Sequence, residues 1–455
     1  MPILISGISG VRGIIDDGFD SGVVEVYTQA FAQLMDNGRI VVAQDSRPSG
    51  AMFKDVVETT LSRMGCEIIN CGICPTPTAQ LMVKDLKARG GIIVTASHNP
   101  IEWNALKFVG AEGLFLDSEE HKQLQIELAK VKEAGLSKAE PTGSVQDLDE
   151  RIELHIENVI GLELINPMAI RKLKPKVVID AINGAGSAAL PAFLERLGCE
   201  VIRLNCDNDG NFVHTPEPLP ENLTELRNEV RRQSADIGIA TDPDADRLAV
   251  IDEFGEPLVE EYTLVLAAYH ALRKADKDDR RPIVTNLSTT MALDELADRY
   301  DRKVIRTPVG EIHVARKMQQ RESLIGGEGN GGVILAESHL GRDSLVASGL
   351  ILSLMAETGK SIREIANDLP RYEMVKDKIN VQGLEPADIL SALAEKYASL
   401  LPNLEDGVKI TWKDRWVHFR ASNTEPIVRI FAEGTNKTVA AALVKEFKTE
   451  IKNLM

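Results

Sequence analysis

Short β-branched apolar runs alternate with segments of helical periodicity along most of the chain. The first set begins with RIVVAQDS at residues 39–46 and ends with GGIIVTAS at residues 90–97, with helices predicted over 51–64 and 78–89. Two further sets repeat this rhythm, one from PKVVIDAING to ADIGIAT and one from RPIVTNLS to SLIGGEGNGG. Alternation of this kind predicts α/β units.

The apolar runs are hydrophobic at nearly every position, which is typical of parallel or mixed sheets covered by helices on both faces. Such sheets bind ligands beyond the carboxyl ends of their strands. Three polar loops follow the last strand of each set: TASHNP at 95–100, DPDADR at 242–247 and GEGNGG at 327–332. We therefore expect three domains to present three loops to one site.

The segment after Tyr372 has a different order: a strand, a helix, three strands and a final helix. This order predicts a small α+β domain. At about 100 to 200 residues per domain, 455 residues suit three or four domains. The sequence predicts an α/β protein with three similar mixed-sheet domains and a C-terminal α+β domain, with boundaries at 1–150, 151–256, 257–370 and 371–455.

Composition narrows the class of protein. With 44% hydrophobic and 27% charged residues the chain is globular, and a formal charge of −17 disfavours nucleic acid and acidic membrane surfaces as partners. No apolar run reaches the roughly 18 residues of a membrane span, and no basic segment precedes the first apolar residues. Five Cys are too few for a disulfide framework. We expect a cytoplasmic location.

The DPDADR loop offers three carboxylates, Asp242, Asp244 and Asp246. Carboxylates at alternate positions of an extended segment point to one side, and oxygen ligands without His or Cys favour Mg²⁺. An EF-hand calcium loop is excluded because Arg247 occupies the position that needs Gly. A solvated acidic turn is the alternative.

The TASHNP loop places Ser97 at the end of an apolar strand without the Gly-x-Ser-x-Gly pattern of an acyl-transfer serine. A hydroxyl beside a divalent ion could instead carry a phosphoryl group, and Arg247 and Lys107 would then help to balance the negative charge. The alternative is an ordinary turn serine, with His98 and Asn99 hydrogen-bonding the loop.

Two further loops offer sugar and phosphate contacts. In GEGNGG, Glu328 and Asn330 could bind sugar hydroxyls, and in RASNTEPIVR the hydroxyl, amide and guanidinium donors suit a phosphate. Each could also be a hairpin loop. The spacing of Cys66, Cys71 and Cys74 is that of an iron–sulfur site, but Cys66 and Cys71 have opposite strand parity, so we interpret them as buried thiols.

These four motifs, in this order over residues 97–429, resemble those of the α-D-phosphohexomutases, which include phosphoglucomutase, phosphomannomutase and phosphoglucosamine mutase. Smaller similarities are SGVRG with Arg12, QDSRPSG with Arg47, NGAG at 183–186 and NALKF with Lys107. The resemblance implies four domains around a central cleft. It implies exchange of phosphate between hexose 1- and 6-phosphates through a phosphoserine and a hexose 1,6-bisphosphate.

The resemblance also implies residue roles. Ser97 would carry the phosphoryl group and, with the three aspartates, hold one Mg²⁺ per chain. Lys107 would be the general acid/base, Arg247 and Arg12 would face the transferred group, and His98 is counted with these catalytic residues. The substrate would be held by Glu328, Asn330, Arg420, Ser422, Asn423, Thr424 and Arg429.

Three positions depart from the family pattern: Asn330 for the frequent Ser, Ala105 for Gly, and Glu311 where bacterial phosphomannomutase/phosphoglucomutases commonly carry His. Sugar preference among glucose, mannose and glucosamine phosphates therefore stays open, as does the oligomeric state. A metal-dependent phosphatase would use the same serine and carboxylates, but it needs neither a sugar loop nor a second phosphate loop. A non-catalytic sensor is disfavoured by the intact serine, aspartates and lysine.

Overall fold

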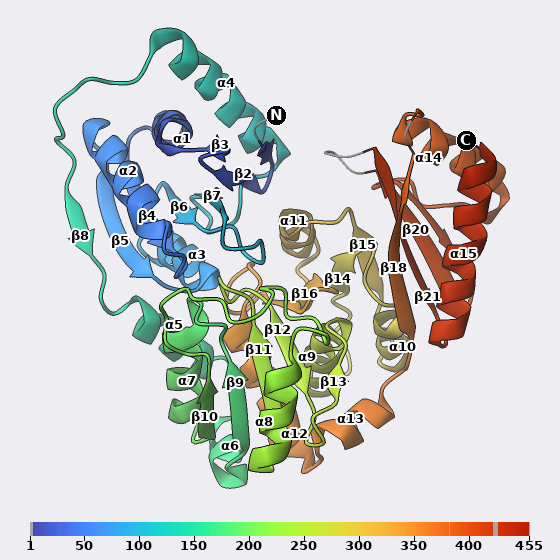
Figure 1. Cartoon of the computed structure of the whole chain (residues 1–455). Helices are drawn as coiled ribbons and strands as arrows, with labels where there is room; N and C mark the ends of the chain where they lie inside the picture. The colour runs from blue at the N-terminus through green and yellow to red at the C-terminus, as the bar shows by residue number, and fades with distance from the viewer. Residues whose placement is uncertain (1–2, 382, 422–425, 455) are drawn as a thin grey trace.

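The computed structural model describes residues 3–381, 383–421 and 426–454, and four sheets follow one another along the chain (Figure 1). The first has eight strands in the order β1-β2-β7-β6-β4-β5-β8, with β3 on β2. Its strands are β1 (Leu4–Gly7), β2 (Gly10–Ile15), β3 (Gly18–Phe19), β4 (Arg39–Gln44), β5 (Glu67–Ile73), β6 (Gly90–Val94), β7 (Trp103–Gly110) and β8 (Val145–Asp147). Its helices are α1 (Ser21–Leu34), α2 (Gly50–Arg63), α3 (Thr76–Asp85) and α4 (Ser118–Ala134).

Both faces of this sheet are covered, as its continuous apolar strands predict. Ile40 and Val42 of β4 pack in one core with residues of α1, α2 and α4, while Val41 and Ala43 pack in another core with residues of α3. Cys66 lies in the first core and Cys71 in the second. The two thiols therefore face opposite sides of the sheet, and the interpretation as buried thiols is confirmed.

The second and third sheets each end in an antiparallel hairpin added to parallel strands. The second has the order β10-β9-β11-β12-β13 and the third β15-β14-β16-β17. The second group comprises α5 (Arg151–Ile160), α6 (Pro167–Leu173), β9 (Lys176–Asp180), α7 (Gly186–Arg196), β10 (Glu200–Leu204), α8 (Thr224–Gln233), β11 (Ile237–Thr241), β12 (Leu248–Ile251) and β13 (Pro257–Leu258). The third comprises α9 (Glu261–Lys274), β14 (Ile283–Asn286), α10 (Ala292–Arg299), β15 (Val304–Thr307), α11 (Glu311–Arg321), β16 (Ile325–Glu328), β17 (Gly332–Leu335), α12 (Ser344–Thr358) and α13 (Ile362–Asp368).

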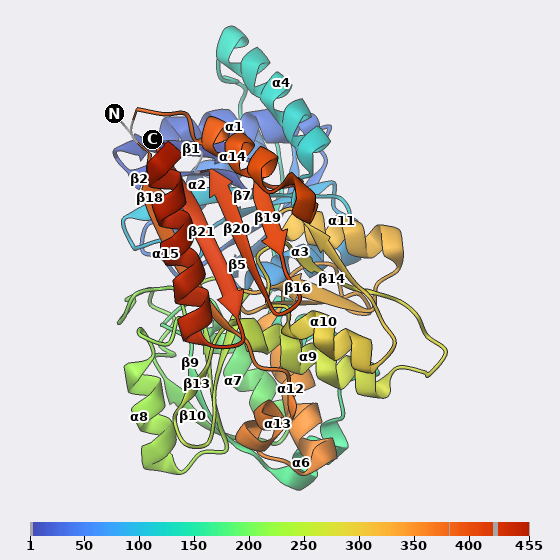
Figure 2. The same cartoon turned by 90° about the vertical axis from the view of Figure 1, so that its right-hand side faces the viewer.

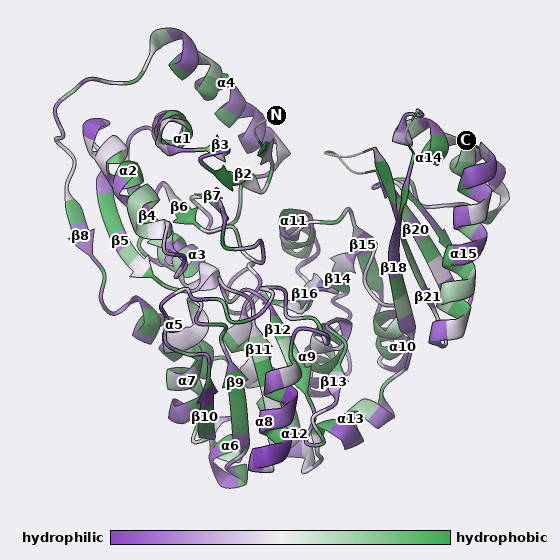
Figure 3. Ribbon diagram, viewed as in Figure 1, coloured by the Kyte–Doolittle hydropathy of each residue, from purple (hydrophilic) through white to green (hydrophobic). Residues whose placement is uncertain are grey.

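These two groups share one hydrophobic core. Leu350 of α12 lies in the same buried cluster as Phe193 of α7, Ile156 of α5 and Leu266 of α9. The strands of both groups are mostly hydrophobic, whereas α8 carries a largely hydrophilic surface (Figure 3). The shared core holds the β11–β12 and β16–β17 hairpins in a fixed relation.

The fourth group is an antiparallel sheet in the order β18-β21-β20-β19, whose two long helices lie on one face (Figure 2). Its elements are β18 (Glu373–Asn380), α14 (Pro386–Lys396), a 3₁₀ turn (Ala398–Leu400), β19 (Val408–Thr411), β20 (Arg415–Ala421), β21 (Ile427–Gly434) and α15 (Lys437–Leu454). It has a separate hydrophobic core. The predicted fold class, three mixed-sheet α/β domains and a C-terminal α+β domain, is confirmed.

Within the described ranges, no single helix is long and apolar enough to cross a bilayer. Helices α12 and α13 pass a test of length and composition only as a pair, and they are bent by 88° at their junction.

Candidate active site

Ser97 lies in a strained turn directly after β6. Its φ is 50°, in the left-handed region that a non-glycine residue rarely adopts. Its N–H donates to Thr95 Oγ1 at 3.0 Å, and Thr95 Oγ1 in turn donates to Asp45 at 2.6 Å. The strained turn is therefore fixed from behind by buried polar groups.

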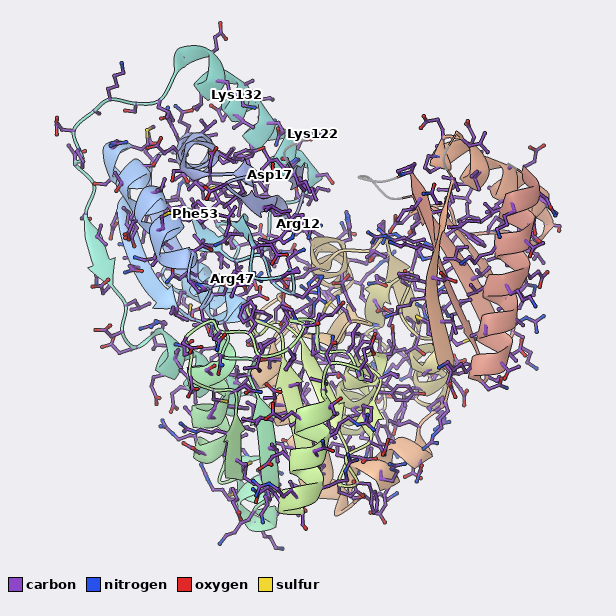
Figure 4. The ribbon with its side chains drawn as sticks, viewed as in Figure 1. Arg12, Asp17, Arg47, Phe53, Lys122 and Lys132 are labelled. Atoms are coloured by element: carbon purple, nitrogen blue, oxygen red, sulfur yellow. The ribbon has the colours of Figure 1, made fainter. Side chains whose placement is uncertain are left out.

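Arg47 is the principal support of this loop. Its guanidinium makes five hydrogen bonds: one to Asp45, at 3.0 Å, and four to carbonyl oxygens of the loop, at 2.5 to 3.2 Å. Those carbonyls belong to Ser97, Asn99, Pro100 and Trp103. Arg47 lies where the first domain meets the second, with Phe212 stacked 5.0 Å from the guanidinium (Figure 4). All five N–H groups of the guanidinium therefore have an acceptor. A lysine ammonium, with three donors at one point, could not reach these acceptors together.

The three aspartates of DPDADR lie together in the β11–β12 turn. One carboxylate oxygen from each lies within 4.8 Å of those from the other two, and all three side chains are buried. Ser97 Oγ donates to Asp242 Oδ2 at 2.9 Å, although the two residues are 145 positions apart. The structure therefore brings Ser97 to the aspartates, as the sequence predicted.

This donor set fits a divalent metal. Among the residues that the structure describes, Asp244 Oδ1 and Asp246 Oδ1 are buried without a hydrogen-bond partner. Burial and the neighbouring Asp246 and Asp244 raise the pKa of Asp242 well above its ordinary value. Three crowded oxygen ligands without imidazole or thiolate suit a hard cation, which would relieve their mutual repulsion.

Lys107 and Arg247 bring positive charge to the aspartates. Lys107 Nζ, on β7, donates to Asp244 Oδ2 at 2.6 Å and lies 3.9 Å from Asp246. Burial lowers the pKa of Lys107, but Asp244 and Asp246 outweigh it and the net shift is upward. Arg247 Nε lies 3.7 Å from Asp242 and 3.8 Å from Asp246. Both cations therefore lie beside the group of carboxylates that Ser97 contacts through Asp242.

His98 is another predicted catalytic residue near Ser97. Its Nδ1 lies 3.3 Å from Ser97 Oγ. Burial, together with Arg247, lowers the pKa of His98 to about 2. The imidazole is therefore neutral at physiological pH.

Glu328 ends β16, and the structure shows the GEGNGG loop to be a hairpin turn between β16 and β17. Its Oε1 accepts hydrogen bonds from Asn286 Nδ2 at 2.9 Å and from the Gly310 N–H at 3.0 Å. Asn330 Nδ2 donates to Glu328 Oε2 at 3.4 Å. The hairpin alternative was thus correct about the backbone, while the carboxylate points toward the site.

Arg342 is a site residue that the sequence reasoning missed. The guanidinium donates to Asp246 Oδ2 at 2.5 Å, to Glu328 Oε2 at 2.9 Å and to Glu311 Oε2 at 2.9 Å. Glu311, one of the departures from the family pattern, is therefore the partner of a buried arginine. An arginine seven residues after β17 has no local pattern that could have identified it.

The buried carboxylates at this centre outnumber the buried cations. Five carboxylates face three cations, so with every group ionised the cluster carries −2, which one divalent cation neutralises. The carboxylates are Asp242, Asp244, Asp246, Glu311 and Glu328, and the cations are Lys107, Arg247 and Arg342. The balance supports a divalent-metal site.

Thr76 and Gln80 also support the site and were missed, whereas the NGAG segment was noted only as a similarity. Thr76, at the start of α3, donates from Oγ1 to Asp244 Oδ2 at 2.7 Å. Gln80 donates to Glu311 at 3.2 Å, and the Ala185 N–H of the NGAG segment donates to Pro243 O at 2.7 Å. These contacts join segments far apart in the sequence, so spacing carried no signal for them.

The predicted phosphate-binding arginines lie on the fourth sheet. Arg420 and Arg429 are paired in register between β20 and β21, and Lys378 of β18 is paired with Arg429 on the other side. Arg12, on β2 of the first domain (Figure 4), donates from Nη1 to Asn99 Oδ1 of the serine loop at 3.3 Å. Burial lowers the pKa of Arg12, and the charge of Arg429 on the fourth sheet lowers it further. Ser422, Asn423 and Thr424 of the predicted loop lie outside the described residues.

A second cluster of metal-type ligands comprises His155, His339 and Asp343. Asp343 Oδ2 lies 2.8 Å from His155 Nε2 and 3.1 Å from His339 Nε2. His339 Nδ1 accepts the Gly341 N–H at 3.1 Å, so its proton must be on Nε2, which then donates to Asp343. A metal on His339 would have to break this arrangement, so we interpret the cluster as a hydrogen-bonded interdomain network.

Comparison with protein families defines the class of the protein. Residues 4–135, 154–255 and 260–372 match phosphoglucomutase/phosphomannomutase α/β/α domains I, II and III, and residues 376–450 match the C-terminal domain of the same family. Enzymes of this class are isomerases that transfer a phosphoryl group within a sugar phosphate. The chain belongs to the phosphoglucomutase/phosphomannomutase family.

Individual relatives agree with this assignment. A phosphoglucomutase/phosphomannomutase of Thermococcus kodakarensis is 37% identical over 442 residues, which cover 95% of each chain. A phosphoglucosamine/phosphogalactosamine mutase of Sulfurisphaera tokodaii is 32% identical and aligns over 97% of this chain and 98% of that one. A crystal structure of a phosphoglucomutase/phosphomannomutase family protein from Burkholderia thailandensis superposes with a TM-score of 0.83 at 25% identity, covering 99% and 98% of the chains.

Proposed function

We propose that this chain interconverts hexose 1-phosphates and hexose 6-phosphates, with glucose, mannose or both as the sugar. The reaction passes through a phosphoserine at Ser97 and a hexose 1,6-bisphosphate. The observation that carries this proposal is the 2.9 Å hydrogen bond from Ser97 Oγ to Asp242, within a group of three buried carboxylates. A serine held in this way is suited to carry a phosphoryl group.

In each half of the reaction, one oxygen–phosphorus bond breaks and one forms. In the first half, the bond between Ser97 Oγ and phosphorus breaks while the free sugar hydroxyl forms a bond to phosphorus and loses its proton. Ser97 Oγ gains a proton in exchange, so it ends as a free hydroxyl. The bisphosphate then turns, and its other phosphoryl group returns to Ser97. We assign the proton transfers to Lys107, whose Nζ lies beside the aspartates. Its ammonium group would give a proton to the departing Ser97 Oγ, and the resulting amine would take up the proton of the sugar hydroxyl. We assign neutral His98 to orienting Ser97 Oγ.

Asp242, Asp244, Asp246 and the phosphoryl group of Ser97 would hold Mg²⁺, which when bound supplies electrostatic stabilisation of the transferred group. Arg247 and Arg12 would face the same group. Glu328 and Asn330 would contact sugar hydroxyls, while Arg420 and Arg429, together with Ser422, Asn423 and Thr424, would hold the phosphate that is not reacting. Water exclusion from this site would protect the bisphosphate from hydrolysis.

Phosphoglucosamine mutase is the alternative, favoured by the 32% identity to the Sulfurisphaera enzyme. One feature of the site supports a neutral hexose instead. Glu328 and Glu311 are both paired with Arg342, so neither carboxylate is free to bind an ammonium group at carbon 2. A hydrolase is the less favoured alternative, since it has no use for two separate anchoring loops.

The test is to incubate the purified protein with Mg²⁺ and a trace of glucose 1,6-bisphosphate and to supply glucose, mannose and glucosamine 1-phosphates in turn. We expect 6-phosphates of glucose or mannose to form faster than that of glucosamine, as measured by phosphorus NMR. Free phosphate without isomer formation would favour the hydrolase, and a preference for glucosamine phosphate would favour the alternative mutase.

A substitution tests the nucleophile directly. We expect mass spectrometry to find one added phosphate on the peptide that contains Ser97 after bisphosphate treatment. Ser97→Ala should abolish turnover and prevent this addition. Ser391→Ala, which removes an exposed hydroxyl that donates to Ala387 O at 2.9 Å, is the control and should keep full activity. Full activity of the Ser97 variant would require another nucleophile.

A further inference from the structure

Asp406 lies just before β19 and joins the fourth domain to the third. Its Oδ2 accepts the Val309 N–H at 2.9 Å and also forms an ion pair with Arg420 Nε at 2.9 Å. The side chains of Asp406 and Arg420 are only 22% and 23% exposed. One carboxylate therefore ties an arginine of the fourth sheet to a backbone segment of the third domain.

A first route leads from Asp406 to the sugar loop. Val309 is followed by Gly310, whose N–H donates to Glu328 Oε1 at 3.0 Å. Gly310 has a φ of 132°, which L side chains rarely adopt, so this segment has little freedom to change shape without losing one contact or the other. The two successive N–H groups point to Asp406 and to Glu328.

A second route uses side chains. His418 Nε2 lies 2.6 Å from Asp406 O, and His418 Nδ1 lies 2.9 Å from Ser288 Oγ. The Ser288 N–H donates to Asn286 Oδ1 at 2.8 Å, and Asn286 Nδ2 donates to Glu328 Oε1 at 2.9 Å. Since a carbonyl only accepts, His418 carries its proton on Nε2 and accepts from Ser288 through Nδ1.

We propose that Asp406 is a positioning residue that fixes the separation between Arg420, at the phosphate end of the substrate, and Glu328, at the hydroxyl end. This inference rests on the proposed function. A hexose phosphate bound in either orientation must contact both ends at once, and two independent routes from Asp406 to Glu328 hold that distance. Preset spacing of two anchoring groups lowers the entropy cost of binding a ligand that spans them.

The proposal predicts opposite effects on two ligands. A hexose phosphate spans both ends, so it should bind less tightly once the separation is no longer fixed. Inorganic phosphate contacts only the cationic end. Removal of a neighbouring carboxylate leaves Arg420 free and takes away a repulsive charge, so inorganic phosphate should bind equally well or more tightly. A residue that only stabilised the fold would weaken both ligands.

The experiment measures KM for glucose 1-phosphate and the competitive inhibition constant of inorganic phosphate in Asp406→Ala. We expect KM to rise about tenfold with kcat within about threefold of the parent, because uniform binding is lost, and the phosphate inhibition constant to stay constant or fall. A parallel rise of both constants, or no change in either, would overturn the proposal.

Two variants complete the design. Asp406→Asn keeps an oxygen that can accept the Val309 N–H but loses the charge. It should raise KM and leave the phosphate inhibition constant unchanged or lower, as expected for Asp406→Ala. This variant decides the question if the alanine variant does not fold. Asp414→Asn removes an exposed carboxylate 3.8 Å from Arg415 and should change neither constant. An inactive parent chain would refute the proposed function, whereas an active parent with parallel losses refutes only the role of Asp406.

Discussion

Single buried side chains carry most of the coupling between the domains at this site. Lys107 of the first domain binds Asp244 of the second, and Arg342 of the third binds Asp246 of the second. Breaking a buried ion pair by removing one partner is far more costly than losing a surface pair, because it leaves a charge without compensation. Substitution of such residues should therefore affect stability and activity together.

Arg47 allows a test at the scale of one residue. Arg47→Lys keeps the charge but cannot reach the four loop carbonyls and Asp45 together, so the turn that holds Ser97 at positive φ should relax. We expect about 2 to 4 kcal/mol less stability, and phosphorylation of Ser97 by glucose 1,6-bisphosphate should slow by at least tenfold. Urea unfolding and timed mass spectrometry measure the two effects.

The control is Arg203→Lys, since Arg203 is half exposed and its ion pair with Glu195 is on the surface. Its cost should be within about 0.5 kcal/mol. If the two lysine variants behaved alike, the fork geometry of Arg47 would be irrelevant to the serine loop.

At the scale of elements, two helices begin with the same N-cap residue type, one partly exposed and one buried, and the two caps should contribute differently to stability. Asp117 caps α4 and Asp343 caps α12, each accepting backbone N–H groups at the helix start. Asp343 also accepts from the imidazoles of His155 and His339, and although burial opposes it, His155 holds the pKa of Asp343 well below its usual range. The cap of α12 is therefore part of an interdomain network as well as a helix start.

Alanine substitution should separate these contributions. Asp117→Ala should cost about 1 kcal/mol, the usual value of an N-cap, while Asp343→Ala should cost about 3 kcal/mol or more because two buried imidazole donors also lose their acceptor. The midpoints of urea unfolding give both numbers. Equal losses would show that the two histidines add nothing to the cap.

The three aspartates of the β11–β12 turn should make the stability of the chain depend on Mg²⁺. Because their carboxylates repel one another when no cation is bound, Mg²⁺ should stabilise the folded chain, by about 2.7 kcal/mol at a hundredfold excess over Kd. Thermal unfolding with Mg²⁺ or with a chelator measures the shift. Asp242→Asn should lose most of this shift, whereas Asp149→Asn, which removes the charge from a side chain that is 92% exposed, should retain it. Equal shifts in both variants would place the ion elsewhere.

At the scale of the whole molecule, buried polar groups dock the fourth domain on the third. His418 bridges Asp406 and Ser288, and Lys409 Nζ donates to Leu287 O at 2.6 Å. Trp416 Nε1 donates to Glu433 Oε2, which also accepts the Met291 N–H of the third domain. An interface of this kind should be sensitive to protonation.

Burial lowers the pKa of His418 from 6.5 to about 4. Above pH 6.5 the imidazole is neutral in both the folded and the unfolded chain. As the pH falls from 6.5 toward 4 only the unfolded chain takes up the proton, so stability is lost at up to about 1.4 kcal/mol per pH unit. His418→Gln should be less stable at pH 7.5, but its stability should fall less steeply on acidification.

His214 gives a control of opposite sign. Burial lowers the pKa of His214, but the hydrogen bond and charge of Asp180 raise it more, so the net shift is upward. Its contribution to stability is present below pH 6.5 and lost as the pH rises through the folded-state pKa. The gap between parent and His214→Gln should therefore widen on acidification. Gaps that moved in the same direction for both variants would contradict this assignment.

The sequence alone determined the repeating α/β units, the α+β character of the last domain and the loops that carry Ser97 and the three aspartates. These features are local. Side-chain periodicity fixes which face of an element is buried, and a polar loop that follows an apolar strand lies at the carboxyl end of that strand. Strands β1, β2, β3 and β7 of the first sheet were not predicted, because they are mixed in polarity. Strand β7 gains its place from pairing with β6, β2 from pairing with β7, and β1 and β3 from pairing with β2.

Only the tertiary structure decided which distant residues complete the site. Arg342, Thr76 and Asp406 meet their partners across 96, 168 and 97 positions of sequence, and no spacing rule connects them. Their partners are set by how the shared core of the second and third domains packs and by where the first and fourth domains rest against it. Contacts made between rigid layers depend on the whole fold, so one segment read alone cannot contain them.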